Sequence, residues 1–590
     1  MKQTLHYRVY PFDPAGHRLK VQLEIPSPSS RCQIVSLPAW IPGSYLIRDF
    51  SRHVESISAW CGKTAMMPRK INANQWSIEG CAGPLTIETI IYAWDLSVRE
   101  AHVDESHAFF NGTSVFLMAE GLQHLPCTVE IQAPPHTNKW KVYSSMPVAP
   151  EQRSKGTVDG LGRYIAPNYD ALIDHPFELG TPAVITFKAF GVLHEMVFTG
   201  TAPGLDLTRI ARDTKRICEA QMTLFDPAEK KAPFVDSASK YVFMTLVTKD
   251  GYGGLEHRAS TALVTSRKDL PVKAHQEAPA GYTQFLGLVS HEYFHTWHVK
   301  RIKPAAFVPY DLLAPNHTSL LWVFEGFTSY FDDLMLLRSG VIDLPAYLKL
   351  LGKTIASVHA SGGRHKQSLA ESSFDAWTKY YKQDENAPNS VVSYYTKGAL
   401  VALGLDLTIR LATDDRRSLD DVMRLLWLRF GKRFYSGRER GLNETGLAAL
   451  IKQATGVDVS VELTQWVQGM ADVPLADLLA RSGIELTWVS DSDTPDLGFT
   501  TKTSGPDLMV RQVFEHGPGH IAGLSAGDQL IAVNDLKVGN SEAAFNALLK
   551  PYQADQVIDL HVFRGDLLKV YRLRLAPPKK NICQIKPTHS

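Results

Sequence analysis

The sequence lacks several features that would assign it to whole classes of protein. No run of 18 or more apolar residues occurs among its 590 residues, so we expect no membrane-spanning helix. The 62 Lys and Arg residues nearly balance the 61 Asp and Glu residues, and this balance favours neither nucleic acid nor a membrane surface as a partner. Internal repeats and low-complexity segments are also absent, which leaves an ordinary globular chain.

Cysteine is scarce, and no two cysteines form a CxxC pair. This scatter predicts neither a disulfide framework nor a thiolate metal site. The N-terminus has no apolar export signal, so a cytoplasmic location is the simplest prediction. The six cysteines are Cys32, Cys61, Cys81, Cys127, Cys218 and Cys583.

The length and the 44% hydrophobic content predict a multidomain α+β protein. Period-two alternation in RLKVQLEI, LTIETIIY and CTVEIQAP predicts an N-terminal antiparallel β-sandwich over residues 1–180. An amphipathic stretch, LDLTRIARDTKRICEAQMTLF, and a β-rich run, YVFMTLVTKD, then indicate a domain of mixed α/β type over 181–395. A helical pattern follows over 396–481.

Short strands return near residue 482 and predict a compact β domain over 482–577. One helix, SEAAFNALLK, interrupts them. The basic tail, 578–590, is expected to be disordered.

The stretch GLVSHEYFHTWHVKR, residues 287–301, contains the pattern HExxH. On a helix, His291 and His295 lie one turn apart on one face and can hold a single Zn²⁺. Glu292 then lies beside the metal, where a general base for an activated water belongs. The alternative is a helix that merely carries two histidines on a polar face.

A zinc hydrolase needs a third protein ligand and one open position. Glu325, in WVFEGFTSYF, is the best candidate because its apolar neighbours would bury a carboxylate that needs a partner. Asp332 is seven residues further on, on the same face, and could accept the outer N–H of a zinc-bound histidine. The alternative is that Glu325 pairs with a Lys or Arg.

Two further segments could bind a substrate. In GGLEH, Gly253 and Gly254 allow a strand edge to approach a ligand closely, and Glu256 could hold a free α-amino group. The alternative is that the two glycines form a turn and that Glu256 is a solvated side chain with no role in binding. Tyr395, in SYYTKGAL, could donate to the oxyanion of a peptide under attack, or could be a core tyrosine.

These motifs together resemble the glycyl aminopeptidase family of metallopeptidases, relatives of the aminopeptidase N and thermolysin clan. The resemblance rests on WIPGSYLIRDF, GGLEHR, HEYFHTWHVKR, WVFEGFTSYF, YTKG and a terminal PDZ-like domain, in that order. It implies a thermolysin-like catalytic domain and one Zn²⁺ per chain on His291, His295 and Glu325. It also implies Glu292 as base, Glu256 as amine anchor and Tyr395 as oxyanion donor, with WIPGSYLIRDF lining the site.

Between His295 and Glu325 lie 29 residues, which is longer than in aminopeptidase N enzymes but like the glycyl aminopeptidases. His298 stands where that family more usually has Asn, so a fourth nitrogen near the metal stays open, although we expect a role in the second shell or the groove. In the PDZ-like domain, Leu497, Gly498 and Phe499 would form the strand that receives a peptide or a protein C-terminus.

We therefore predict a zinc aminopeptidase that removes small N-terminal residues, Gly or Ala, from peptides with a free N-terminus. The first alternative is a zinc endopeptidase of the same clan that ignores the amine. The second is a catalytically silent scaffold that binds peptides through its PDZ-like domain, against which the intact Glu292 counts.

Overall fold

The computed structural model describes residues 3–29, 31–135, 139–150 and 160–588. The chain divides into two compact units. The first unit comprises residues 1–317, 331–342 and 423–446, and the second comprises 318–330, 343–422 and 447–590. Residues 318–330 and 343–422 of the second unit interrupt the first unit along the chain.

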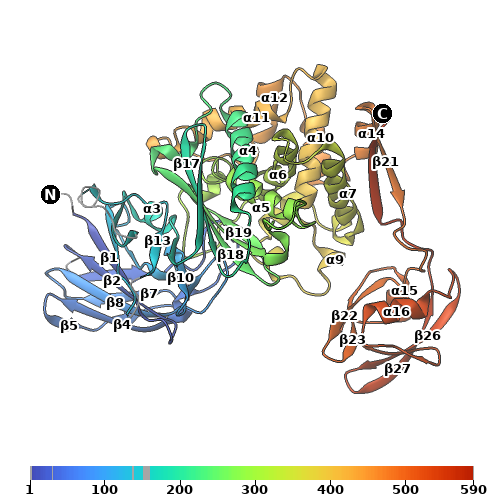
Figure 1. Cartoon of the computed structure of the whole chain (residues 1–590), viewed down its shortest axis with the longest axis horizontal. Coiled ribbons are helices and arrows are strands. Elements are labelled where there is room, and N and C mark those ends of the chain that lie inside the picture. The colour runs from blue at the N-terminus through green and yellow to red at the C-terminus, as the bar shows by residue number, and fades with distance from the viewer. Residues whose placement is uncertain (1–2, 30, 136–138, 151–159, 589–590) are drawn as a thin grey trace. The chain divides into compact units, whose positions relative to one another are not determined.

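The N-terminal part of the first unit, up to residue 180, contains three β-sheets (Figure 1). The strand Arg18–Ile25 alternates as its sequence predicted, with Leu19, Val21, Leu23 and Ile25 buried in the core. In sheet order, the first sheet holds β14 (Gly162–Ala166), β12 (Cys127–Ile131), β1 (Leu5–Asp13), β2 (Arg18–Ile25), β8 (Leu85–Tyr92), β4 (Val54–Cys61) and β5 (Thr64–Met66). The second holds β13 (Lys141–Tyr143), β15 (Phe177–Gly180), β10 (His107–Phe110) and β9 (Ala101–Val103). The third holds β11 (Met118–Ala119), β3 (Cys32–Ser36), β7 (Gln75–Glu79) and β6 (Arg69–Lys70), and two short helices, α1 (Gly112–Val115) and α3 (Tyr169–Ile173), complete the region.

Two features of this region differ from the sequence predictions. Strands β1 and β12 pair in parallel, so the first sheet is mixed rather than purely antiparallel. Cys61 and Cys81 form a disulfide, although no disulfide was predicted. Cys61 ends β4 and Cys81 lies just before β8, and the pairing of these two strands brings the cysteines together. Because disulfides persist mainly in oxidising compartments, the bond gives no support to the cytoplasmic prediction.

A five-stranded sheet follows in the first unit. Its order is β16 (Ala183–Ala189), β17 (Val192–Thr199), β18 (Lys240–Thr248), β20 (Ser260–Ser266) and β19 (Tyr252–Glu256). Figure 1 shows helix α4 (Leu207–Phe225) running alongside this sheet, with α5 (Tyr282–Phe294) next to it. The GGLE segment therefore forms an edge strand, β19, which pairs with β20 on one side only.

The second apolar helix that the sequence predicted begins with a π-helical turn, Trp322–Gly326, and continues without a break as α6 (Phe327–Arg338). The predicted helical region also forms. It contains α10 (Thr396–Thr413), α11 (Leu419–Leu426), α12 (Leu447–Thr455), α13 (Ser460–Leu463) and α14 (Leu475–Arg481), and it follows α7 (Leu344–Ala360), α8 (Leu369–Phe374) and α9 (Ala387–Ser390).

The C-terminal β region of the second unit is a six-stranded sheet with its own apolar core. Its strands are β22 (Phe499–Ser504), β23 (Asp507–Val513), β24 (Gln529–Val533), β25 (Leu536–Lys537), β26 (Val557–Arg564) and β27 (Leu567–Arg574), with helices α15 (Pro518–Ala522) and α16 (Glu542–Leu549). The strand β21 (Ile484–Val489) lies outside this sheet and pairs with β28 (Ile582–Pro587).

The pairing of β21 with β28 corrects the prediction of a disordered tail. The backbone of Cys583 in β28 packs against Gly352 in α7, where a Cβ atom would lie 2.5 Å from the Cys583 carbonyl oxygen. A basic composition predicted disorder because it does not reveal a partner strand about one hundred residues away. No helix of the described residues is long and apolar enough to cross a membrane.

Candidate active site

The two histidines of HExxH lie at the C-terminal end of α5. The helix ends at Phe294, earlier than the predicted stretch, and His295 is its C-terminal cap in helical conformation. The backbone N–H of His295 still donates to the carbonyl of His291 at 3.3 Å, so the two side chains keep their one-turn spacing. Their ring centroids are 4.7 Å apart, with the ring planes at 86°.

Each histidine is held through its Nδ1 atom. Nδ1 of His291 lies 2.9 Å from Oδ2 of Asp332, and Nδ1 of His295 lies 2.8 Å from the backbone carbonyl oxygen of His298. An Nδ1–H donated to an oxygen fixes the tautomer in which Nε2 carries the lone pair that can bind a metal. His298 thus contacts His295 through its backbone, and its own ring packs edge-on against Phe294.

Both the backbone and the side chain of Asp332 are held by hydrogen bonds. Its backbone carbonyl accepts a hydrogen bond of 2.8 Å from the Ser290 hydroxyl, and the N–H of Asp333 donates to its Oδ1 at 2.6 Å. Burial raises the pKa of the Asp332 carboxyl, and the hydrogen bond from His291 acts against that rise. The bond between Ser290 and Asp332 links α5 to α6, so the orientation of His291 depends on this helix pair.

Glu325 lies on the π-helical turn that continues into α6, seven residues before Asp332. Two helical turns separate residues at this spacing, so their side chains lie on about the same face. Glu325 is buried, and ligand atoms of His291, His295 and Glu325 lie within 4.8 Å of one another. Two imidazoles and one carboxylate are a donor set that suits Zn²⁺ with an open fourth position.

A second group contains two carboxylates. Glu256 and Glu292 are both buried, and each has a carboxylate oxygen within 4.8 Å of a ring nitrogen of His295 and of the other carboxylate. A Cβ atom on Gly254 would lie 2.2 Å from Oε1 of Glu292. The glycine therefore lets edge strand β19 lie directly against Glu292, whereas nothing lies within 4 Å of a Cβ on Gly253.

The segment WIPGSYLIRDF supplies a wall next to Glu256. Gly43 has a φ of 103°, and a Cβ atom there would lie 2.4 Å from Oε2 of Glu256. Trp40 anchors the segment by donating from Nε1 to the carbonyl of Asp311 at 2.8 Å, and Tyr45 stacks on Phe307. The sequence suggested that this segment lines the site, but it could not show that Gly43 closes over the carboxylate of Glu256.

A buried ionic network lies directly after Glu256 in the chain. Asp174 accepts from the backbone N–H of Arg258 at 2.9 Å and forms an ion pair with Lys300 at 2.7 Å. His257 also contacts Asp174, at 3.4 Å. Burial alone would raise the pKa of Asp174, but Lys300 and its other partners hold that pKa well below its usual value. Sequence reasoning missed Asp174 because no motif joins it to residues more than eighty positions away.

In the second unit, Glu325 and Tyr395 belong to elements that pack closely. A Cβ atom on Gly326 would lie 2.6 Å from the Cα of Gly398, so these glycines let the π-helical turn touch the start of α10 backbone to backbone. Tyr395, at the N-terminal cap of α10, is partly exposed and stacks on Tyr394 at 4.6 Å. Its hydroxyl lies 3.5 Å from that of Tyr381.

The predicted peptide strand of the C-terminal region begins an edge of its sheet. Phe499 is the first residue of β22, which pairs with β23 on one side. Gly498 has a φ of 69° and packs against Pro518. The carbonyl oxygens of Leu497 and Gly498 accept hydrogen bonds from Gly519 and Phe514. The turn before β22 is therefore fixed within the domain.

Comparisons with known proteins agree with the sequence resemblance. The model of the peptidase M61 N-terminal domain matches residues 6–181, and that of M61 glycyl aminopeptidase matches residues 284–401. No curated protein matches. A crystal structure of an aminopeptidase N family protein from Idiomarina loihiensis is 39% identical, with a TM-score of 0.93, over 99% of this chain and 98% of that chain.

More distant solved structures include an M1 zinc metallopeptidase from Deinococcus radiodurans, at 14% identity and a TM-score of 0.48. A mutant of it bound to a Tyr-Ser-Ala substrate gives 15% identity and a TM-score of 0.47. Both matches cover 80% of this chain and 95% of the other. The family assignment rests on the family models and the structure from Idiomarina loihiensis. This chain belongs to the M61 glycyl aminopeptidase family and is a metallopeptidase, a hydrolase of peptide bonds.

Proposed function

We propose that the protein is a zinc-dependent aminopeptidase that removes single residues from the free N-terminus of peptides. The observation that carries this proposal is the pair of buried carboxylates, Glu256 and Glu292, beside His295. Hydrolysis needs one carboxylate as general base. A second buried carboxylate needs a cation, and the ammonium group of a peptide N-terminus supplies one.

Gly43 supports an exopeptidase rather than an endopeptidase. The WIPGSYLIRDF segment lies against Oε2 of Glu256, where even a Cβ atom would clash. A peptide whose amine reaches Glu256 therefore has no room for a further residue on the amine side. The Gly43 segment and Glu256 together select the N-terminal residue of the substrate peptide as the one to be released.

The donor set on His291, His295 and Glu325 fits one zinc ion. The bound ion supplies Lewis acidity toward the scissile carbonyl and lowers the pKa of water. Asp332 and the carbonyl of His298 keep the two imidazoles in the tautomer that presents Nε2. We assign His298 to this supporting role, through its backbone.

Glu292 takes a proton from the attacking water and returns it to the departing amine. Its carboxylate is positioned by contact with Gly254 of the edge strand. Glu256 holds the substrate ammonium group and fixes the register of the peptide. Tyr395 donates its phenolic hydrogen to the oxyanion, and its partial exposure leaves the hydroxyl accessible to substrate.

Small first residues, Gly or Ala, are the proposed preference, since the family description names a glycyl aminopeptidase. For the C-terminal region we propose a PDZ-like peptide-binding domain. Its edge strand β22 faces helix α16, with Phe499 close to Phe545. An extended peptide that adds to this edge would lie beside Leu497, Gly498 and Phe499.

A panel of aminoacyl arylamides, assayed with zinc-loaded and chelator-treated protein, tests the proposed activity. We expect Gly and Ala arylamides to be hydrolysed fastest, and zinc to restore activity after chelation. Protein that carries zinc but hydrolyses none of the panel, while it cleaves internal bonds of longer peptides, would favour the endopeptidase.

A further inference from the structure

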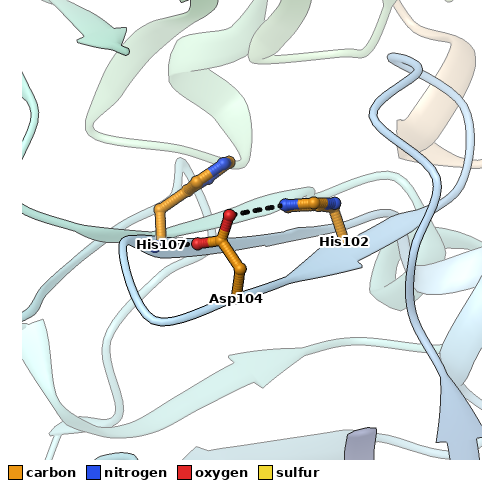
Figure 2. Close-up of side chains that lie close together, drawn as sticks. All are labelled: His102, Asp104 and His107. Carbon is orange, nitrogen blue, oxygen red and sulfur yellow. Dashed lines mark hydrogen bonds and ion pairs between the residues drawn. The ribbon is translucent and has the colours of Figure 1, made fainter. Parts of the chain in front are cut away.

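A second cluster of metal-ligating side chains lies on a β-hairpin far along the sequence from HExxH. His102 is the middle residue of strand β9, Asp104 lies in the turn, and His107 begins strand β10. Figure 2 shows Asp104 between the two histidines. One potential ligand atom from each residue lies within 4.8 Å of the others, and both histidines are buried.

The two oxygens of Asp104 have separate partners. Oδ1 accepts from the backbone N–H of Ser106 at 2.7 Å and from that of His107 at 3.0 Å, and it thereby closes the turn. Oδ2 faces Nε2 of His102 at 3.3 Å. One oxygen therefore holds the hairpin, and the other is directed toward the histidines.

His107 repeats the arrangement of His291. Its Nδ1 lies 3.1 Å from Oε1 of Glu178, and Thr199 donates to the same oxygen at 2.8 Å. An Nδ1–H donated to a carboxylate leaves Nε2 as the lone pair for a metal, as it does for His291 and Asp332. Glu178 is buried and committed to these two partners.

His102 has a polar atom that the surrounding protein does not satisfy. The side chain is 1% exposed, and its Nδ1 has no hydrogen-bond partner among the residues that the structure describes. Trp94 stacks on the ring of His102 at 4.8 Å, and His17 stacks on Trp94 at 3.7 Å. Buried polar atoms without a hydrogen-bond partner are rare, so the buried Nδ1 of His102 suggests that the ring has a ligand.

A small cavity of about 20 Å³, enough for one water molecule or ion, is lined by His102, His107 and Glu178. The rest of its lining is almost entirely apolar: Leu96, Val98, Phe109, Met244, Leu246, Ala262, Leu263 and Val264, with Ser97. Three polar groups thus converge in an apolar pocket. Asp104, which is partly exposed, gives the cluster access to solvent.

We propose that His102, Asp104 and His107 bind a second divalent transition-metal ion of the zinc class. Two imidazoles and one carboxylate suit such ions, whereas Ca²⁺ and Mg²⁺ prefer oxygen ligands. We assign this ion a structural role, because Glu178, the carboxylate that lines the cavity, already accepts hydrogen bonds from His107 and Thr199 and is not left to act as a base.

The placement of the cavity indicates what the ion would stabilise. It lies between the β9–β10 hairpin and strands β18 and β20, which supply Met244 and Leu263. Leu263 of β20 pairs with Gly254 of β19, the strand that carries Glu256. An ion on the hairpin therefore fastens the N-terminal region to the sheet whose edge strand holds the proposed amine anchor.

Metal content of the full-length protein tests this proposal. The protein is equilibrated with Zn²⁺, dialysed, and measured by mass spectrometry for zinc per chain. We expect two ions in the unmodified protein and one in His102→Phe, which keeps a ring to stack on Trp94 but removes both nitrogens. His17→Phe, a change on the other face of Trp94, is the matched control and keeps two ions.

Asp104→Asn provides an independent variant, because its amide oxygen still accepts the turn hydrogen bonds. It is expected to lose the second ion in the same dialysis, and Zn²⁺ is expected to raise its Tm less than that of the unmodified protein. One ion per chain in the unmodified protein would overturn the proposal. Two ions in Asp104→Asn, with or without a folded His102→Phe, would overturn it as well.

Discussion

The chain contains two clusters of histidines and carboxylates that use the same chemistry in different settings. One is formed around α5, with His291 held by Asp332. The other is formed by the β9–β10 hairpin, with His107 held by Glu178. In both, a carboxylate accepts from Nδ1 and leaves Nε2 available. Metal-ligand geometry alone therefore does not distinguish a catalytic site from a structural one.

The clusters differ in what surrounds them. Next to His295 lie two further buried carboxylates, Glu256 and Glu292, on elements shaped by glycines. Next to His102 lies a small cavity that is mostly apolar. Catalysis needs a base and a group that binds substrate. The cluster around His295 has two further carboxylates that could supply these, whereas the cluster around His102 does not.

Glu292→Gln removes the proposed general base and keeps the shape of the side chain. We expect kcat to fall by roughly 1,000-fold or more, with zinc retained, because general-base catalysis contributes about 10²–10⁴-fold. His102→Phe, at the other cluster, is expected to change kcat by less than about threefold. Comparable losses in the two variants would remove the distinction between the clusters. Steady-state kinetics with an alanyl arylamide measures both.

Asp174→Asn tests the ionic network that follows Glu256. Removing one partner of a buried ionic cluster costs about 3–5 kcal/mol, so we expect the urea midpoint at pH 7 to fall markedly. The partners of Asp174 hold its folded pKa below the unfolded value. Its stabilisation is therefore present above about pH 4 and lost as the pH falls further.

Urea unfolding between pH 3 and pH 7 measures this contribution. The unmodified protein should lose stability more steeply below about pH 4 than Asp174→Asn does. Parallel curves for the two proteins would show that Asp174 is not the group responsible. The half-exposed Glu130, changed to Gln, is the control and should leave the curve unchanged.

Glu256→Gln removes the charge of the proposed amine anchor. We expect kcat/KM for peptides with a free N-terminus to fall by roughly 100-fold, about 2.7 kcal/mol, as for a buried charge pair that loses one partner. Zinc content should not change. A variant with full activity would show that the second carboxylate near His295 has another purpose.

Asp332→Asn weakens the support of His291. Loss of such a partner commonly costs 10–100-fold in metal affinity, and we expect a zinc dissociation constant raised by about that factor. Glu178→Gln should do the same for the ion at the hairpin cluster and leave the catalytic ion in place. Competition with a chelator separates the two affinities. If each variant weakened both ions equally, the clusters would not be independent.

Gly254→Ala places a methyl group where Oε1 of Glu292 lies. We expect about a tenfold loss of kcat, since the carboxylate must shift to make room. Gly83→Ala is the matched control, because its Cβ would meet only Sγ of Cys61, at 3.8 Å. An active Gly254→Ala enzyme would show that Glu292 tolerates a different position.

The features that local spacing encodes were predictable from the sequence. HExxH defines two histidines one turn apart, and alternation in RLKVQLEI defines a strand with one buried face. Asp332 could be chosen because it follows Glu325 by two helical turns. The hairpin cluster also has a local pattern, HxDxxH, but its spacing is not that of ligands on one helix face, so a turn is needed to bring the three side chains together.

Features that depend on distant pairing were not predictable. Gly43 lies against Glu256 although the two are 213 positions apart in the sequence, and Asp174 pairs with Lys300 across 126 positions. The Cys61–Cys81 disulfide and the pairing of β21 with β28 arise in the same way. Such contacts depend on how sheets and helices pack, and no local pattern in a single sequence indicates which residues will meet.

The central claim, that Glu256 selects a free amine, is tested most directly by one comparison of substrates. A short Ala-initiated peptide and its N-acetylated form are incubated with the zinc-loaded enzyme, and the released alanine and any internal fragments are measured. The account predicts rapid release of alanine from the free peptide and at least a 100-fold slower reaction of the acetylated one. Equal cleavage of the two peptides would contradict it.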